Sequence, residues 1–224
     1  MIVAIDGPAG AGKSTVAKAV AKRLGYRYMD TGAMYRALAW KVMLRGADPV
    51  DEGALEGILE TTVVDLGADE AVMLDGTDVS GEIRTAEVGQ MASRVSGIGI
   101  VRSRMADLQR SMGRSGCVVA EGRDMGTVVF PDAEVKIYLD ASPETRAQRR
   151  FRELAGEDPA LTLEQTLADV MRRDRRDKER AVAPLRKADD AVLIDSTRLS
   201  VTAVVAKILK EVNAKSNENG RIVS

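Results

Sequence analysis

The sequence IDGPAGAGKST at residues 5–15 decides which fold this chain can adopt. It contains the pattern G-x-x-x-x-G-K-S/T, placed between a short apolar run at residues 2–5 and an amphipathic segment at residues 13–24. A buried strand, a glycine-rich turn and a helix are the context in which this pattern forms a phosphate-binding loop. We therefore expect a nucleoside triphosphate site at this turn.

The residue types of this loop suit an anionic ligand. Glycines let the backbone approach phosphate oxygens, so that successive N–H groups at a helix N-terminus point at the anion. Lys13 then reaches the β- and γ-phosphates, and Ser14 supplies an oxygen to Mg²⁺. We expect Lys13 to be exposed, so that its loss leaves the fold intact. The predicted ATP-binding residues are Gly7, Pro8, Ala9, Gly10, Ala11, Gly12, Lys13, Ser14 and Thr15.

Strand and helix patterns alternate along the rest of the chain. An Asp75-Gly76 pair predicts a hairpin inside a small antiparallel insertion. Short apolar runs, typical of buried strands, lie at residues 2–5, 26–29, 117–120, 135–139 and 191–194. Helical patterns lie at residues 13–24, 31–45, 51–60, 85–112 with a break at 97–99, 143 to a break at 156–159, 162–180 and 200–212. This alternation predicts a doubly wound α/β domain with two lateral insertions.

Composition excludes several chemistries. The 224 residues include no histidine and a single cysteine, which removes disulfides, multi-thiolate zinc sites and histidine-assisted nucleophiles. We expect that cysteine, Cys117, to pack in the core. Apolar residues make up 45% and no apolar run approaches the ~18 residues that span a bilayer, so we expect a cytoplasmic protein without a membrane partner.

Charge is segregated along the chain although the formal net charge is only −1. Residues 47–87 carry twelve acidic residues against one arginine, which argues against a nucleic-acid polymer as partner. Residues 172–180 carry six basic and three acidic residues. This second segment either binds a local anion or forms the ion-paired face of a helix.

Two further motifs follow expected strands, DTGAMYR at residues 30–36 and EGRDMGT at residues 121–127. In open α/β sheets, ligands bind outside the carboxyl ends of the strands, where both motifs and the phosphate loop belong. Transfer between two phosphates must gather several negative charges, which suits guanidinium groups, although each arginine alone could equally form a surface ion pair. The candidate arginines are Arg36, Arg102, Arg123, Arg173 and Arg180.

Together these segments strongly resemble the bacterial cytidylate (CMP) kinases from Ile2 to about Val212. The motifs that carry the resemblance are IDGPAGAGKST (5–15), DTGAMYR (30–36), DVSGEIRT (78–85), EGRDMGTVVFPDA (121–133), RRDRRDKERAVAPL (172–185) and LIDST (193–197). The phosphate loop fits many nucleotide hydrolases and kinases, whereas SGEIRT and GRDMGTVVFPDA are particular to this family.

The resemblance implies a three-layer P-loop kinase fold with a central parallel sheet, an enlarged monophosphate-binding insertion and a helical lid. The implied single domain covers residues 1–213, with a core at about 1–30, 101–150 and 188–213, a monophosphate-binding region at about 31–100 and a lid at about 151–187. Residues 214–224 are expected to form a disordered tail. The implied CMP-binding residues are Thr31, Arg36, Ser93, Arg102, Arg123, Asp124, Arg173, Asp177 and Arg180, and the implied catalytic residues are Lys13, Arg123, Arg173 and Arg180.

The expected reaction is Mg²⁺-assisted transfer of a phosphoryl group from ATP to CMP or dCMP by a monomer. Its nucleophile, a phosphate oxygen of CMP, is largely ionised near pH 7 because its second pKa is ~6, so no general base is required. One alternative is a kinase of the same fold that acts on UMP, AMP or a shikimate-type acceptor. The other is a nucleotide-dependent regulatory module, which leaves the candidate arginines unexplained.

Overall fold

The computed structural model describes residues 1–67, 70–156, 160–218 and 220. It divides into two compact units, and each is described separately below. The first unit contains residues 1–28 and 115–224, and the second contains residues 29–114. The second unit is therefore larger than the expected region at 31–100, because it includes a helix that we expected in the core.

The first unit is built on a parallel sheet. The strands are β1 (Ile2–Asp6), β2 (Arg27–Asp30), β6 (Val118–Gly122), β7 (Val135–Asp140) and β8 (Val192–Asp195), in the order β2-β6-β1-β7-β8. β1 pairs in parallel with β6 and β7, and β7 pairs in parallel with β8. The carboxyl ends of β1, β6, β7 and β8 therefore share one edge of the sheet, which confirms the expected α/β class.

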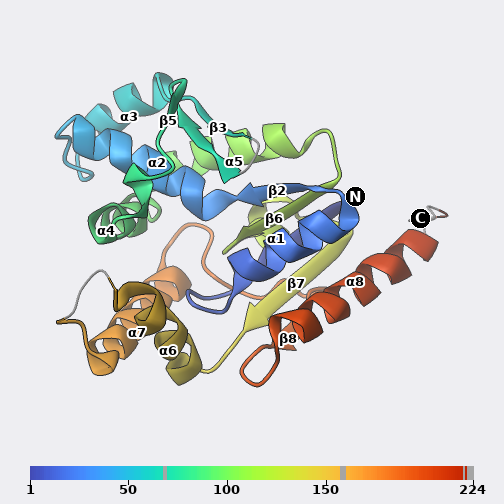
Figure 1. The fold of residues 1–224 in the computed structure, drawn as a ribbon. Coiled ribbons are helices and arrows are strands. Elements are labelled where there is room, and N and C mark those ends of the chain that lie inside the picture. The colour runs from blue at the N-terminus through green and yellow to red at the C-terminus, as the bar shows by residue number, and fades with distance from the viewer. Residues whose placement is uncertain (68–69, 157–159, 219, 221–224) are drawn as a thin grey trace. The chain divides into compact units, whose positions relative to one another are not determined.

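Helices cover this sheet and extend beyond its edge. α1 (Lys13–Leu24) and α8 (Val201–Glu218) bury their apolar stripes against β1 and β7 in one cluster that includes Ile5, Leu139 and Ile208. α6 (Pro143–Leu154) and α7 (Leu163–Glu179) pack against each other near the arrowhead of β7 in Figure 1. The side chains of Ser142 and Thr162 cap the N-termini of these two helices.

The second unit has its own core. Helices α2 (Thr31–Leu44), α3 (Glu52–Glu60), α4 (Ala86–Val95) and α5 (Gly99–Gly113) surround a three-stranded sheet in the order β3-β4-β5. The strands are β3 (Val64–Leu66), β4 (Val72–Leu74) and β5 (Thr77–Asp78), and a short 3₁₀ turn, η2 (Glu82–Arg84), leads into α4. The antiparallel pair β4–β5 turns at Asp75-Gly76, both at positive φ, as a tight hairpin requires.

Two sequence-based expectations are wrong. Cys117 is exposed rather than buried, because it lies in a left-handed turn (φ 52°) with Gly116 and the strand begins only at Val118. Helix α8 continues to Glu218, because Ser216 extends the buried face that contains Val212 and donates its hydroxyl to the Val212 carbonyl at 2.9 Å. The expected disordered tail is thus helical over residues 214–218, and most of the rest lies outside the described residues.

The break expected at 156–159 also lies largely outside the described residues, since 157–159 are not among them. Residues 151–187, the expected lid, comprise the end of α6, α7 and the segment before β8, all within the first unit. Among the residues that the structure describes, no helix is both long and apolar enough to span a membrane.

Candidate active site

The phosphate loop joins β1 to α1 and fits tightly against its neighbours. A Cβ on Gly7 would lie 1.9 Å from the Leu139 carbonyl oxygen, so only glycine fits at this position. Gly10 has φ +75°, and a Cβ there would lie 2.9 Å from the backbone oxygen of Arg146. The path of the loop is thus fixed by contact with the backbones of β7 and α6. The backbone therefore keeps one shape in which N–H groups can face an anion.

Lys13, the first residue of α1, is buried, and the expectation that it is exposed is wrong. Its ammonium group donates to the Pro8 carbonyl at 2.8 Å, so the side chain is hydrogen-bonded to the backbone of the phosphate loop. Burial lowers the pKa of Lys13 to about 7, and the positive charges of Arg123 and Arg173 lower it in the same direction. The carboxylates of Glu121 and Asp177 act in the opposite direction, so both cations and carboxylates meet in this desolvated place.

Arg123 and Asp177 form an ion pair between β6 and α7. The Arg123 guanidinium donates through Nε to Asp177 Oδ2 at 2.9 Å, and both side chains are mostly buried. Burial alone would raise the pKa of Asp177, but the charges of Arg123 and Arg173 reverse this and hold it below its usual value. Asp177 is therefore ionised and anchors α7 beside the phosphate loop.

Arg180, at the end of α7, lies 3.8 Å from the Asp124 carboxylate, and both side chains are buried. The Arg180 Nε donates to the Ala183 carbonyl at 2.6 Å, which fixes the direction of its guanidinium. The first unit thus brings together Lys13 and five of the predicted CMP-binding residues. These five are Arg123, Asp124, Arg173, Asp177 and Arg180.

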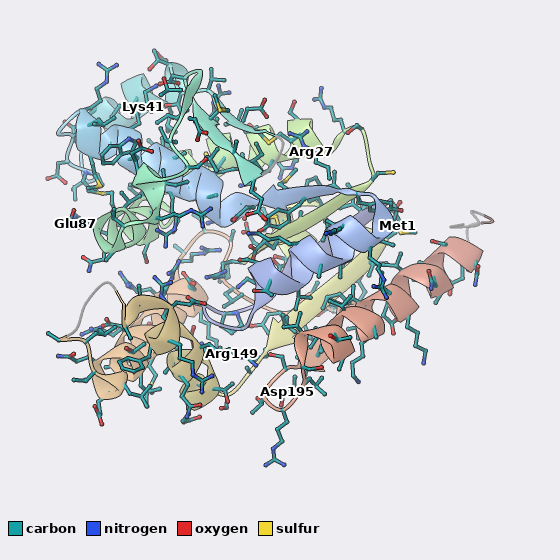
Figure 2. All side chains as sticks on the ribbon, viewed as in Figure 1. Met1, Arg27, Lys41, Glu87, Arg149 and Asp195 are labelled. Atoms are coloured by element: carbon teal, nitrogen blue, oxygen red, sulfur yellow. The ribbon has the colours of Figure 1, made fainter. Side chains whose placement is uncertain are left out.

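Two arginines on α6 hold the phosphate loop, and the sequence analysis missed both. Arg146 donates to the Ala9 carbonyl at 3.2 Å and pairs with Asp174 of α7 at 2.7 Å. Arg149 donates to the Ala11 carbonyl at 3.2 Å and to the Ser196 carbonyl at 2.8 Å. Figure 2 labels Arg149 on α6 and Asp195, which precedes Ser196, at the end of β8. The basic run RAQRR just after a strand end was the available signal.

The other predicted CMP-binding residues belong to the second unit, where Thr31 begins α2 and is buried. The Arg36 guanidinium donates to the Ile83 carbonyl at 2.9 Å and to the Thr85 carbonyl at 3.4 Å, which gives the SGEIRT motif a physical role. A Cβ on Gly89 would lie 3.0 Å from that guanidinium, so glycine makes room for it. Gly89 is a third position that the sequence analysis missed.

Arg102 and Ser93 complete this second set. Arg102 is buried, donates to the Ser96 carbonyl at 3.0 Å and lies 5.7 Å from the centre of the Tyr35 ring. The Ser93 hydroxyl is buried and has no hydrogen-bond partner among the described residues. A buried hydroxyl in that state indicates a site that a polar ligand completes.

The described residues contain no group of three or more acidic or cysteine side chains that could hold a metal ion. The Ser14 residue, in the first turn of α1 beside Lys13, is exposed. This arrangement fits an ion such as Mg²⁺ that is held mainly by nucleotide phosphates and waters, with one hydroxyl from the protein.

The low pKa of Lys13 predicts proton uptake when ATP binds. At pH 8 the unliganded lysine is largely neutral, and the phosphates of ATP raise its pKa, so the complex takes up about 0.5–1 proton. ATP itself is fully ionised at this pH. Calorimetric titration in two buffers with different ionisation enthalpies measures the uptake, which Lys13→Met abolishes. Equal heats in both buffers would contradict the prediction.

Comparison with known proteins identifies the family of this chain. The sequence model described as cytidylate kinase matches residues 3–214. Cytidylate kinases from Geobacter sp. (strain M21) and Bacillus pumilus (strain SAFR-032) are each 50% identical, over 92% of this chain and 89% and 93% of their own lengths. The cytidylate kinase of Mycobacterium leprae (strain Br4923) is 48% identical over 96% of this chain and 97% of its own.

Solved structures with the same fold are more distant in sequence. An uncharacterised protein from Eubacterium ventriosum matches with a TM-score of 0.54 and 13% identity over 96% of this chain and 99% of its own. A shikimate kinase from Bacteroides thetaiotaomicron matches with a TM-score of 0.50 and 11% identity over 95% and 98%. These two support the fold alone. The family model and the close relatives decide the family, and this chain belongs to the cytidylate kinases.

Proposed function

We propose that this chain transfers the γ-phosphoryl group of ATP directly to CMP and dCMP, giving ADP and CDP or dCDP. The observation that carries the proposal is the convergence of Lys13, Arg123 and Arg173 at the phosphate loop, with a depressed lysine pKa. A binding module for one nucleotide needs the loop alone, whereas transfer between two phosphates needs further cations beside the loop.

In this proposal the chain supplies positions and charge rather than a proton acceptor. Lys13 binds the β- and γ-phosphates of ATP, while the other residues of the loop bind through their N–H groups. Arg123, Arg173 and Arg180 neutralise the charge that is spread over the transferred group in a loose, in-line transition state. Ser14 would hold a magnesium ion together with the phosphates, and the ion would supply further neutralisation of phosphate charge. We further propose that the chain acts as a monomer in the cytoplasm.

The acceptor site uses the remaining residues. Arg36 binds the phosphate of CMP, and its carbonyl partners at Ile83 and Thr85 fix the direction in which the guanidinium points. Asp124 accepts from the exocyclic amino group of cytosine, and Arg102 donates to the ring nitrogen and carbonyl. Thr31, Ser93 and Asp177 contribute further polar contacts. Uracil places a carbonyl oxygen where cytosine has its amino group, so a carboxylate disfavours it.

The decisive experiment is a coupled ADP-release assay of the purified chain with CMP, dCMP, UMP, AMP and shikimate in turn. We expect turnover with CMP and dCMP to exceed that with the other acceptors by at least an order of magnitude.

Lys13→Met should lower kcat by about 10²-fold or more, because it removes a positive charge that stabilises the transferred phosphoryl group. Preference for another acceptor, or activity unchanged in Lys13→Met, would refute the proposal.

Asp124→Asn keeps the size of the side chain but removes its charge and offers a donor to the uracil oxygen. We expect kcat/KM for CMP to fall about 10- to 150-fold, from ~1.5–3 kcal/mol for a charged hydrogen bond, while the CMP/UMP preference shrinks. Steady-state kinetics with both acceptors measures this. If both acceptors lose the same factor, another residue distinguishes the bases.

Gly89→Ala separates stability from acceptor binding. Alanine favours the helix by up to ~1 kcal/mol, so the melting temperature should rise by about 2–4 °C. The new methyl group crowds the Arg36 guanidinium, so KM for CMP should rise about threefold or more. Gly57→Ala in α3, with open space around the new methyl group, is the control: it should stabilise the protein without changing KM. Equal KM values in the two variants would contradict the role given to Gly89.

A further inference from the structure

Asp6, the last residue of β1, is a buried carboxylate outside the set of residues that bind the nucleotides. Its two oxygens accept from successive backbone N–H groups, Oδ1 from Met125 at 2.8 Å and Oδ2 from Gly126 at 2.7 Å. Bonds this short to a carboxylate are among the stronger hydrogen bonds of proteins. Burying an ionised carboxylate costs free energy, so its position calls for a functional explanation.

The two N–H groups begin a short π-helical turn, η3 (Met125–Val129). In this turn the Val129 N–H donates to the Asp124 carbonyl at 3.1 Å, and the Phe130 N–H donates to the Met125 carbonyl at 2.7 Å. The first N–H groups of any helical turn have no partner inside it. Asp6 therefore supplies, from a neighbouring strand, the cap that this turn requires.

Asp124 itself occupies the N-cap position of the turn, where an aspartate side chain usually accepts from the N–H groups that follow it. Here the Asp124 side chain makes no such cap and lies 3.8 Å from Arg180 instead. The N–H groups of Met125 and Gly126 are already taken by Asp6. The Asp6 carboxylate thus occupies the first N–H donors of the turn, and the Asp124 carboxylate is directed at Arg180.

We infer that Asp6 is a positioning residue for acceptor recognition, which caps the turn after Asp124 so that the Asp124 carboxylate faces the bound base and does not fold back onto its own turn. This inference rests on the proposed function. Asp6 acts through Asp124 and touches neither nucleotide.

The close fit at Gly126 supports this role. A Cβ at Gly126 would lie 3.5 Å from the Asp6 carboxylate and 3.3 Å from the Lys136 side chain, so the turn lies directly against both strands. Burial raises the pKa of Asp6 to about 6 against the opposing effect of its two N–H donors; the facing charges are Asp124, which raises it, and Lys13, which lowers it. At neutral pH Asp6 is ionised and accepts with both oxygens.

The test replaces Asp6 by asparagine, which turns one acceptor into a donor that faces an N–H group. We expect the CMP/UMP ratio of kcat/KM to fall about tenfold or more, with KM for ATP within about twofold of the wild type. The amides of Met125 and Gly126 should exchange with solvent at least about tenfold faster. Asp51→Asn is the matched control, because Asp51 also caps a helix, α3, through the Ala54 N–H at 3.0 Å.

An unchanged CMP/UMP ratio, or equal factors lost for ATP and for CMP, would overturn the inference and leave Asp6 as a structural residue. If Asp6→Asn does not fold, the wild type provides a second measurement. CMP and UMP carry the same phosphate, so its ionisation cancels in their ratio. We expect that ratio to narrow as the pH falls through about 6, and a constant ratio from pH 8 to 5.5 overturns the inference.

Failure of the proposed function gives a different result. In that case the wild type itself shows no preference for CMP, while the exchange of the Met125 and Gly126 amides still reports whether Asp6 caps the turn. Loss of the CMP preference only in the variant, with the control unchanged, supports both proposals.

Discussion

The structure depends on keeping several positive charges together in a place with little water. Burial lowers the pKa of Lys13, and two nearby arginines act in the same direction. Moving an ammonium group out of water costs several kcal/mol unless partners compensate. The unliganded protein meets this cost by partial neutralisation of the lysine. Bound polyphosphate would raise the pKa of Lys13 again and so restore its positive charge for phosphoryl transfer.

Carboxylates on α7 hold this cluster in shape. Asp177 anchors Arg123, and Asp174, one turn earlier on α7, anchors Arg146. The spacing of three residues places both on one face of α7, and these contacts hold that helix against β6 and α6. Arg146 also binds the phosphate loop, so the loop and α7 share a partner. A shift of α7 would therefore move Arg146 and, through it, the phosphate loop.

Local patterns predicted most of the fold. The strand, loop and helix around residues 5–15 and the hairpin at Asp75-Gly76 follow from short-range rules, and the structure has them where expected. The errors concern long-range packing. Nothing in the pattern of the loop indicates that Lys13 is buried, or that Cys117 lies in a turn before its strand. The boundary between the two units also depends on the packing of α5, which its sequence does not specify.

The candidate site was predictable as a set of residue types but not as a set of partners. Sequence identified Arg36 and Arg102, while only the structure gives the carbonyl groups and the aromatic ring that orient them. The kind of partner carries information. A carboxylate, as Asp174 is for Arg146, cancels the charge that it orients. A carbonyl, as Pro8 is for Lys13, fixes direction while leaving the charge. Both kinds of partner occur among the proposed site residues, since Arg36 is oriented by carbonyl groups and Arg123 by the Asp177 carboxylate.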